Sequence, residues 1–217
     1  LHLSIRRQRQ MCIRDSFKTA PAPQASVGLR FGVSGDSRGE LAPYPSIGNV
    51  ASRRLDFFVN LGDTIYADVP SPAVTNSQVR TLEQFRRKHA EVLGNQRGLP
   101  SMADLRASTA LFTTIDDHEV INDFAGGAAV SSDSRFDTTG KLINETQLYR
   151  DGLKAFSEFN PLKDVTYQTP GVARTDGKPK LYRAARYGLD ASLFLLDARS
   201  FRDAELTAPE DPNNALQ

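Results

Sequence analysis

The 217-residue sequence predicts an α/β fold, because short apolar segments of strand length alternate with longer amphipathic segments. Four of the apolar segments run directly into aspartate or glycine-aspartate, as expected where strands end in functional loops. Hydrophobic residues make up 39% of the chain and charged residues 24%, which is the composition of a globular domain with a core. The formal net charge of +1 gives no reason to expect a nucleic-acid partner. No apolar run approaches the roughly 18 residues that span a bilayer, so we expect no stable membrane insertion.

The first half of the chain predicts three strands. Residues 27–35 alternate partly and end in glycine, residues 55–61 form an apolar run stopped by Gly62-Asp63, and residues 110–115 end at an aspartate. Residues 45–54 are expected to form a short helix. A strand, a helix and a second strand in succession favour parallel pairing with a right-handed crossover.

Three further segments have helical spacing. Residues 81–93 give the clearest pattern, with one face made by Leu82, Phe85, His89 and Val92. Residues 102–108 predict a second, shorter helix. Residues 144–159 predict a third, with Asn144 as its expected N-cap.

The remaining segments predict a long loop and two more strands. Residues 126–140 are polar and rich in glycine, serine and aspartate, which indicates a surface loop. Residues 181–187 and 191–196 are strand-like and are joined by a short turn that contains Gly188.

Residues 1–16 differ in composition from the rest of the chain. Their sequence, LHLSIRRQRQMCIRDS, resembles the translation of a common adapter of transposon-based DNA sequencing libraries. A basic arm or the start of a targeting peptide are alternatives, but no apolar region follows the charges. We expect an assembly artefact without ordered structure. The only cysteine, Cys12, lies in this segment, so disulfide and thiolate chemistry are not expected.

The acidic residues that follow the predicted strands suggest a metal site. Asp36, Asp63 and the pair Asp116-Asp117 follow three different strands, and loops at the carboxyl ends of parallel strands converge. Carboxylates brought together repel one another unless a cation neutralises them. Taken singly, Asp36 and Asp63 are each better explained as a turn residue or a helix N-cap.

Among the histidines and the other acidic residues, only His118 is a candidate for a role in chemistry. His118 lies between two acidic residues directly after an apolar strand, a position that suits a metal ligand or a general acid. His89 is better explained as part of the amphipathic helix. Asp68 and Asp123 are expected to be solvated loop residues. The sequence Asp36-Ser37-Arg38 lacks the second aspartate that aspartyl-phosphate chemistry requires.

Four motifs together resemble the alkaline phosphatase D family of metallophosphoesterases: Ser34–Gly39 (SGDSRG), Leu61–Tyr66 (LGDTIY), Asp116–Val120 (DDHEV) with Asn122, and Leu196–Arg202 (LDARSFR). The resemblance implies that residues 27–217 are the N-terminal half of a catalytic domain, a partial four-layer αββα sandwich that is truncated at its C-terminus. Residues 17–26 are expected to be a linker or, by the same resemblance, the last strand of a preceding β-sandwich domain.

The resemblance also implies metal ligands. Asp63 resembles the bridging ligand, Tyr66 the phenolate ligand of iron, and Asp117 the metal-binding asparagine of the wider superfamily. Asp36 stands where many members have a cysteine ligand, and a carboxylate is a harder ligand than a thiolate. Asn122 matches a calcium or phosphate contact.

The remaining implied roles concern the phosphoryl group. His118 resembles the histidine beside the transition state, acting as the acid for the leaving group or as a phosphate contact. Arg38 and Arg199 can bind phosphate oxygens in bidentate fashion, and surface salt bridges explain both arginines equally well.

By resemblance, the expected function is hydrolysis of phosphate monoesters or diesters with a di- or trinuclear centre of iron and calcium that activates water. The expected partners are small phosphate esters, and the expected location is periplasmic or extracellular, with no targeting segment in this sequence. The resemblance also implies further metal ligands, an aspartate and a histidine, in a distal Gly-Asp-x-His segment. No histidine follows His118 in this sequence, so that segment is absent. We therefore expect weak metal binding and little activity. The alternative is a catalytically incomplete cation-binding or interaction module.

Overall fold

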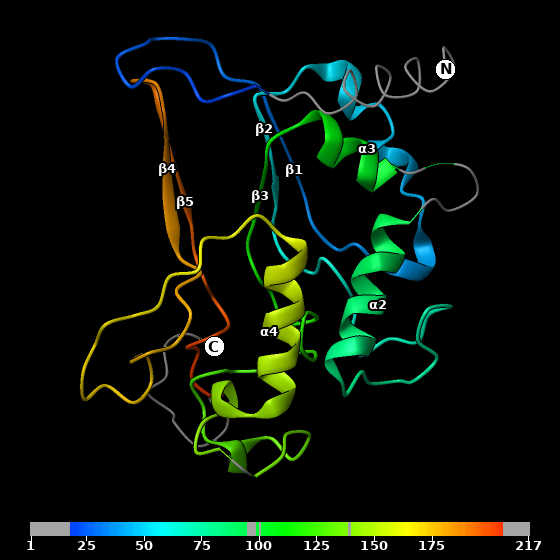
Figure 1. Ribbon diagram of the computed structural model, residues 1–217, viewed down its shortest axis with the longest axis vertical. Helices are drawn as coiled ribbons and strands as arrows, with labels where there is room; N and C mark the ends of the chain where they lie inside the picture. Colours follow the sequence, from blue (N-terminus) through cyan, green and yellow to red (C-terminus); the bar gives the residue numbers. More distant parts are fainter. Residues whose placement is uncertain (1–17, 95–98, 100, 139, 206–217) are drawn as a thin grey trace, which may run out of the picture.

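A parallel three-stranded sheet lies between a layer of helices and a two-stranded hairpin (Figure 1). The computed structural model describes residues 18–94, 99, 101–138 and 140–205. The sheet order is β1-β2-β3, and the bounds are Phe31–Ser34 for β1, Phe57–Asn60 for β2 and Leu111–Thr113 for β3. The predicted α/β class and the parallel pairing are therefore confirmed. Residues 1–16, expected to be an artefact, lie outside the described residues.

The connection between β1 and β2 differs from the predicted helix. Instead of one helix over residues 45–54, the chain forms two short 3-10 turns, Pro45–Ile47 and Val50–Arg53. Gly48 ends the first turn, and glycine is among the residues that least favour continued helix. A third 3-10 turn, Gly39–Leu41, precedes them.

The helices cover one face of the sheet. Helix α2 spans Leu82–Leu93, α3 spans Ser101–Ser108, and α4 spans Gln147–Phe159 and packs against α2. Helix α2 begins with a capping box in which the backbone N–H of Gln84 donates to the Thr81 hydroxyl and the Gln84 side chain accepts from the backbone of Thr81.

Helix α4 is capped by Thr146 and not by the predicted Asn144. The 3-10 turns Val130–Ser132 and Ile143–Glu145 precede the helix, and Asn144 lies inside the second turn. The Asn144 amide instead donates to the backbone oxygen of Ser200 at 2.9 Å. None of the helices in the described part of the chain has the length and apolar character that crossing a membrane requires.

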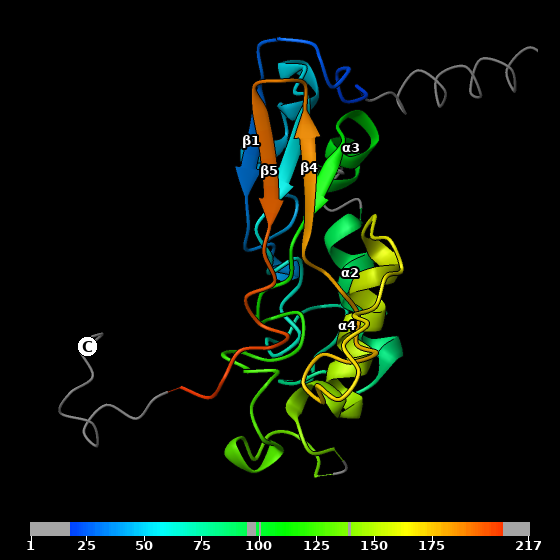
Figure 2. The ribbon, with the colours of Figure 1, turned by 90° about the vertical axis from the view of Figure 1, so that its left-hand side faces the viewer.

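The hairpin lies on the opposite face of the sheet (Figure 2). Strands β4, Arg183–Tyr187, and β5, Ala191–Leu195, pair in antiparallel fashion, as the sequence predicts. Side chains alternate across β2, so Phe57 and Val59 pack against Tyr187 and Leu195 of the hairpin, whereas Phe58 joins the core under the helices. Two apolar layers therefore flank the central strand.

The hairpin leaves apolar side chains of β1 exposed. Phe31 stacks on Phe57 with 5.2 Å between ring centroids, yet it is 52% exposed, and Val33 is 50% exposed. On β5, Phe194 is 62% exposed, and Leu196 just beyond the strand is 66% exposed. Residues 18–26, of the predicted linker, reach the turn of the hairpin, where Ser26 Oγ donates to Asp190.

Candidate metal site

The loops that carry the acidic motifs leave the sheet at the carboxyl ends of β1, β2 and β3. The turn after β2 has two consecutive left-handed residues, Gly62 with φ of 106° and Asp63 with φ of 51°. A side chain on Gly62 would place its Cβ 2.6 Å from the backbone nitrogen of Asp116. Glycine therefore allows the loop after β2 to touch the loop after β3.

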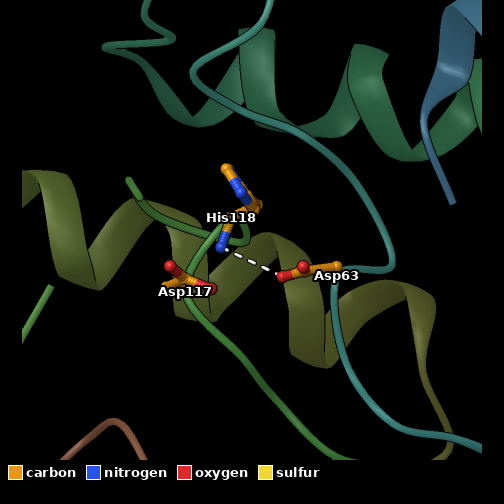
Figure 3. Close-up of side chains that lie close together, drawn as sticks. All are labelled: Asp63, Asp117 and His118. Carbon is orange, nitrogen blue, oxygen red and sulfur yellow. Dashed lines mark hydrogen bonds between the residues drawn. The ribbon is translucent and has the colours of Figure 1, made fainter. Parts of the chain in front are cut away.

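Asp63, Asp117 and His118 form a compact group in which one ligand atom of each residue lies within 4.8 Å of the others (Figure 3). Both carboxylates are buried, with Asp63 7% and Asp117 4% exposed. The backbone N–H of His118 donates to Asp63 Oδ1 at 3.2 Å. This hydrogen bond links the loop after β2 to the loop after β3 at the site itself.

The Tyr66 hydroxyl connects Asp36 to this group. Its hydroxyl oxygen lies 2.7 Å from Asp36 Oδ1 and 3.3 Å from Asp63 Oδ2, and its ring stacks on the His118 imidazole with 4.0 Å between centroids. Burial and the hydrogen bond to Asp36 raise the pKa of the Tyr66 phenol above its usual range. The structure thus brings together five of the predicted site residues, from three loops.

The charges of this group suit a bound cation. Burial raises the pKa of Asp63 to about 6, and the neighbouring charge of Asp117 adds to the increase, although His118 opposes it. A cation would relieve both costs, because it replaces lost hydration and screens the repulsion. Carboxylate and phenol oxygens with one imidazole are donors that a hard or borderline divalent or trivalent metal accepts.

Asp68 was expected to be a solvated loop residue, and that expectation is wrong. Its Oδ1 lies 2.6 Å from His118 Nδ1, its Oδ2 accepts the backbone N–H of Asn122 at 2.8 Å, and its side chain is only 12% exposed. The hydrogen bond and charge of Asp68 outweigh burial and raise the pKa of His118, and the pKa of Asp68 itself is lowered. His118 Nε2 is then the ring nitrogen left for a ligand or a substrate.

Arg199 lies among three aspartates. Its Nε is 2.5 Å from Asp116 Oδ1, and its terminal nitrogens lie 3.4 Å from Asp117 Oδ1 and 3.9 Å from Asp123 Oδ1. The side chain of Asp123 is 71% exposed, as predicted for a solvated acid. Arg199 therefore forms ion pairs at the edge of the group, and its phosphate-binding role stays a prediction.

Arg38 lies beside Tyr66. Its guanidinium is 5.4 Å from the centroid of the Tyr66 ring, and its Nε donates to Glu40 at 2.6 Å. Asn122 donates its side-chain amide to Asp123 Oδ2 at 2.7 Å. The predicted roles of Arg38 and Asn122 also stay predictions.

Sequence reasoning assigned no role to Glu119, although its side chain is fully buried beside the site. Its carboxylate accepts hydrogen bonds from the loop after β2. Its place between His118 and an apolar residue was the only signal in the sequence, and that signal does not distinguish a buried carboxylate from a solvated one.

Comparisons with known proteins agree on one family. The sequence profile of the PhoD-like phosphatases matches residues 32–216. Alkaline phosphatase D of Bacillus subtilis (strain 168) is 29% identical over 202 residues, which cover 86% of this chain and 31% of that protein. A solved structure of PhoD superposes with a TM-score of 0.63 at 26% identity and covers 86% of this chain and 34% of its own. The chain thus spans about a third of the length of these relatives. It belongs to the PhoD-like phosphatase family.

Proposed function

We propose that this chain contributes the N-terminal part of the active site of a metal-dependent phosphoric ester hydrolase that acts on phosphate monoesters or diesters. The observation that carries the proposal is the convergence of Asp63, Asp117 and His118 within 4.8 Å, with Asp36 and Tyr66 alongside. Membership of the PhoD-like phosphatases and the likeness to alkaline phosphatase D support it.

Asp36, Asp63, Tyr66 and Asp117 would hold the metals, for which we propose iron and calcium. A bound cation would polarise the phosphoryl oxygen and lower the pKa of a water molecule. Asp36 provides a carboxylate where many family members have cysteine, which favours harder ions at this position. The buried carboxylates, with the pKa of Asp63 already raised to about 6, support a cation in this place.

His118 would transfer the proton to the leaving group. Asp68 holds Nδ1 at 2.6 Å, fixes the orientation of the ring and favours its protonated form. The Nε2 proton is then available to an alkoxide or phenoxide, as general acid catalysis requires. Arg38, beside Tyr66, and Arg199, beside Asp117, would bind phosphate oxygens.

The test is a titration of the chain with iron(III) and, separately, with calcium. An iron(III) ion bound by the Tyr66 phenolate produces a visible charge-transfer band, so the wild-type chain is expected to colour and Tyr66→Phe is not. Asp63→Asn is expected to lose binding of both ions in calorimetry. A band of equal strength in Tyr66→Phe would contradict the proposed ligand set.

Hydrolysis of an aryl phosphate and a bis-aryl phosphate is measured in parallel. We expect turnover from a protein of the length of the relatives and little from these 217 residues, because no histidine follows His118. Cation binding without hydrolysis in the longer protein would favour the non-catalytic alternative. By family similarity we also propose a periplasmic or extracellular location for the whole protein, which cell fractionation tests.

A further inference from the structure

We propose that Glu119 is a positioning residue whose buried carboxylate joins the loops after β2 and β3, so that Asp63 and Asp117 face the same cation. The inference rests on the proposed function for its consequence in catalysis. The link between the two loops rests only on the hydrogen bonds of the metal-free chain.

The carboxylate of Glu119 accepts four hydrogen bonds from two loops. Oε1 accepts the backbone N–H and the hydroxyl of Thr64, both at 2.6 Å. Oε2 accepts the backbone N–H of Asp63 at 3.3 Å and that of Asp116 at 2.9 Å. One side chain therefore binds the backbone of Asp63 and the backbone of Asp116, which directly precedes Asp117.

The four donors require a carboxylate. A carboxylate only accepts hydrogen bonds and does so at both oxygens, whereas a glutamine amide has one accepting oxygen and one NH₂ group. In Glu119→Gln the NH₂ group would face either the two donors of Thr64 or the N–H groups of Asp63 and Asp116. Because Glu119 is 0% exposed, water cannot replace the lost acceptor without a rearrangement of the loops.

The turn that Glu119 holds is strained. Asp63 has a φ of 51°, in the left-handed region that costs a non-glycine residue free energy, and it directly follows Gly62 at 106°. Such a conformation persists only where the surroundings fix it. The bonds to the N–H groups of Asp63 and Thr64 provide this restraint, and Asp116 anchors the same carboxylate to the neighbouring loop.

Glu119 would act on the cation only through these loops, because its four bonds occupy both oxygens. Residues that orient metal ligands in this way typically change metal affinity by about 10–100-fold when mutated. We therefore expect Glu119→Gln to weaken calcium binding by about this factor.

The experiment measures amide hydrogen exchange in the metal-free 217-residue chain, and then calcium affinity by calorimetry. In Glu119→Gln the amides of Asp63, Thr64 and Asp116 are expected to exchange at least about 10-fold faster, while those of α2 and α4 keep their protection. Thr64→Val is the matched control. It removes one bond to Oε1 but leaves both loops joined, so its calcium affinity should change much less than in Glu119→Gln.

Glu119→Asp provides a second variant if Glu119→Gln does not fold. It keeps the charge but withdraws the oxygens from the donors, so the same three amides should exchange faster than in wild type. Wild-type exchange at these amides in a folded Glu119 variant, or an increase spread evenly over the chain, would overturn the proposal. If the wild-type chain binds no calcium, the proposed metal site fails, whereas the exchange result still decides the role of Glu119.

Discussion

The contact between Asp68 and His118 shows how one hydrogen bond determines the protonation state of a site residue. The hydrogen bond that the Nδ1–H of His118 donates to Asp68 raises the pKa of His118, although burial of the ring lowers it. The pair therefore favours an imidazolium that keeps its proton on Nε2 for transfer.

Asp68→Asn is expected to lower the pKa of His118 in the metal-free chain, because the variant loses the charge that stabilises the imidazolium. NMR titration of the His118 ring protons measures the change. Asp123→Asn is the control, since it removes a carboxylate that is 71% exposed and pairs with Arg199, whereas Asp68 contacts the His118 ring. An unchanged His118 pKa in Asp68→Asn would rule out this pairing in solution.

His89 provides a prediction about pH and stability away from the site. Its ring is 3% exposed in α2 and stacks on Phe159 with 5.0 Å between centroids, and burial lowers its pKa to about 3, with a smaller effect from the charge of Arg106. Because the folded pKa is below the unfolded one, the unfolded chain binds the proton first as pH falls. Stability is therefore lost progressively from about pH 6.5 to about pH 3.

His89→Leu is expected to remove this part of the pH dependence. The free energy of unfolding from urea titrations should fall between pH 7 and pH 5 by about 2 kcal/mol more in wild type than in the variant. Comparing the two slopes cancels the constant effect of the changed packing against Phe159. Equal slopes would mean that His89 is protonated in the folded chain.

At this scale the sequence predicted the positions of strand ends better than contacts between loops. Asp36, Asp63 and the pair Asp116-Asp117 could be found because each follows an apolar run, and parallel strands bring such positions together. The family resemblance then selected Asp117 from the pair. The roles of Asp68 and Glu119 could not be found in the same way. Their partners lie 50 and 55 residues away, and which loop residues meet depends on left-handed turns that sequence patterns do not reveal.

At the scale of elements, the start of α4 shows where local patterns mislead. Asn144 precedes the helix and is a favoured N-cap type, so the sequence predicts it as the cap. The turn Ile143–Glu145 moves the start to Thr146, whose hydroxyl accepts the backbone N–H of Tyr149 at 3.4 Å. Asn144 is instead used in a long-range contact with Ser200.

Thr146→Ala is expected to destabilise the chain by about 1 kcal/mol through loss of the cap. Thr81→Ala, which removes the cap of α2, is the matched comparison and should cost a similar amount. Chemical denaturation of both variants measures the free energies of unfolding. A Thr146→Ala chain as stable as wild type would show that another group caps α4.

At the scale of the whole molecule, the sheet layers are covered unequally. The hairpin packs on β2 through Phe57 and Val59, while Phe31 and Val33 of β1 stay half exposed. Strands β1 and β5 are also edges within the described sheets, with backbone groups that can pair with another chain. Together these features favour self-association of the 217-residue chain.

Phe194→Lys is expected to reduce this association, because Phe194 is 62% exposed on the outer face of β5 and a lysine there disfavours edge pairing. Light scattering and sedimentation over a range of concentrations measure it. Leu189→Lys is the control, since Leu189 is 55% exposed in the turn of the hairpin and away from the edge. A wild-type chain that stays monomeric at every concentration would contradict the expectation.

The order β1-β2-β3 has a thermodynamic consequence for the proposed metal site. Asp36, Asp63 and Asp117 leave three strands that are already hydrogen-bonded as neighbours, so a cation closes short loops on a preformed edge. Little chain entropy remains to be lost on binding, because the sheet has already fixed the loop ends. Folding and metal loading are then separate equilibria, and chelation should empty the site while the sheet keeps its cooperative melting transition.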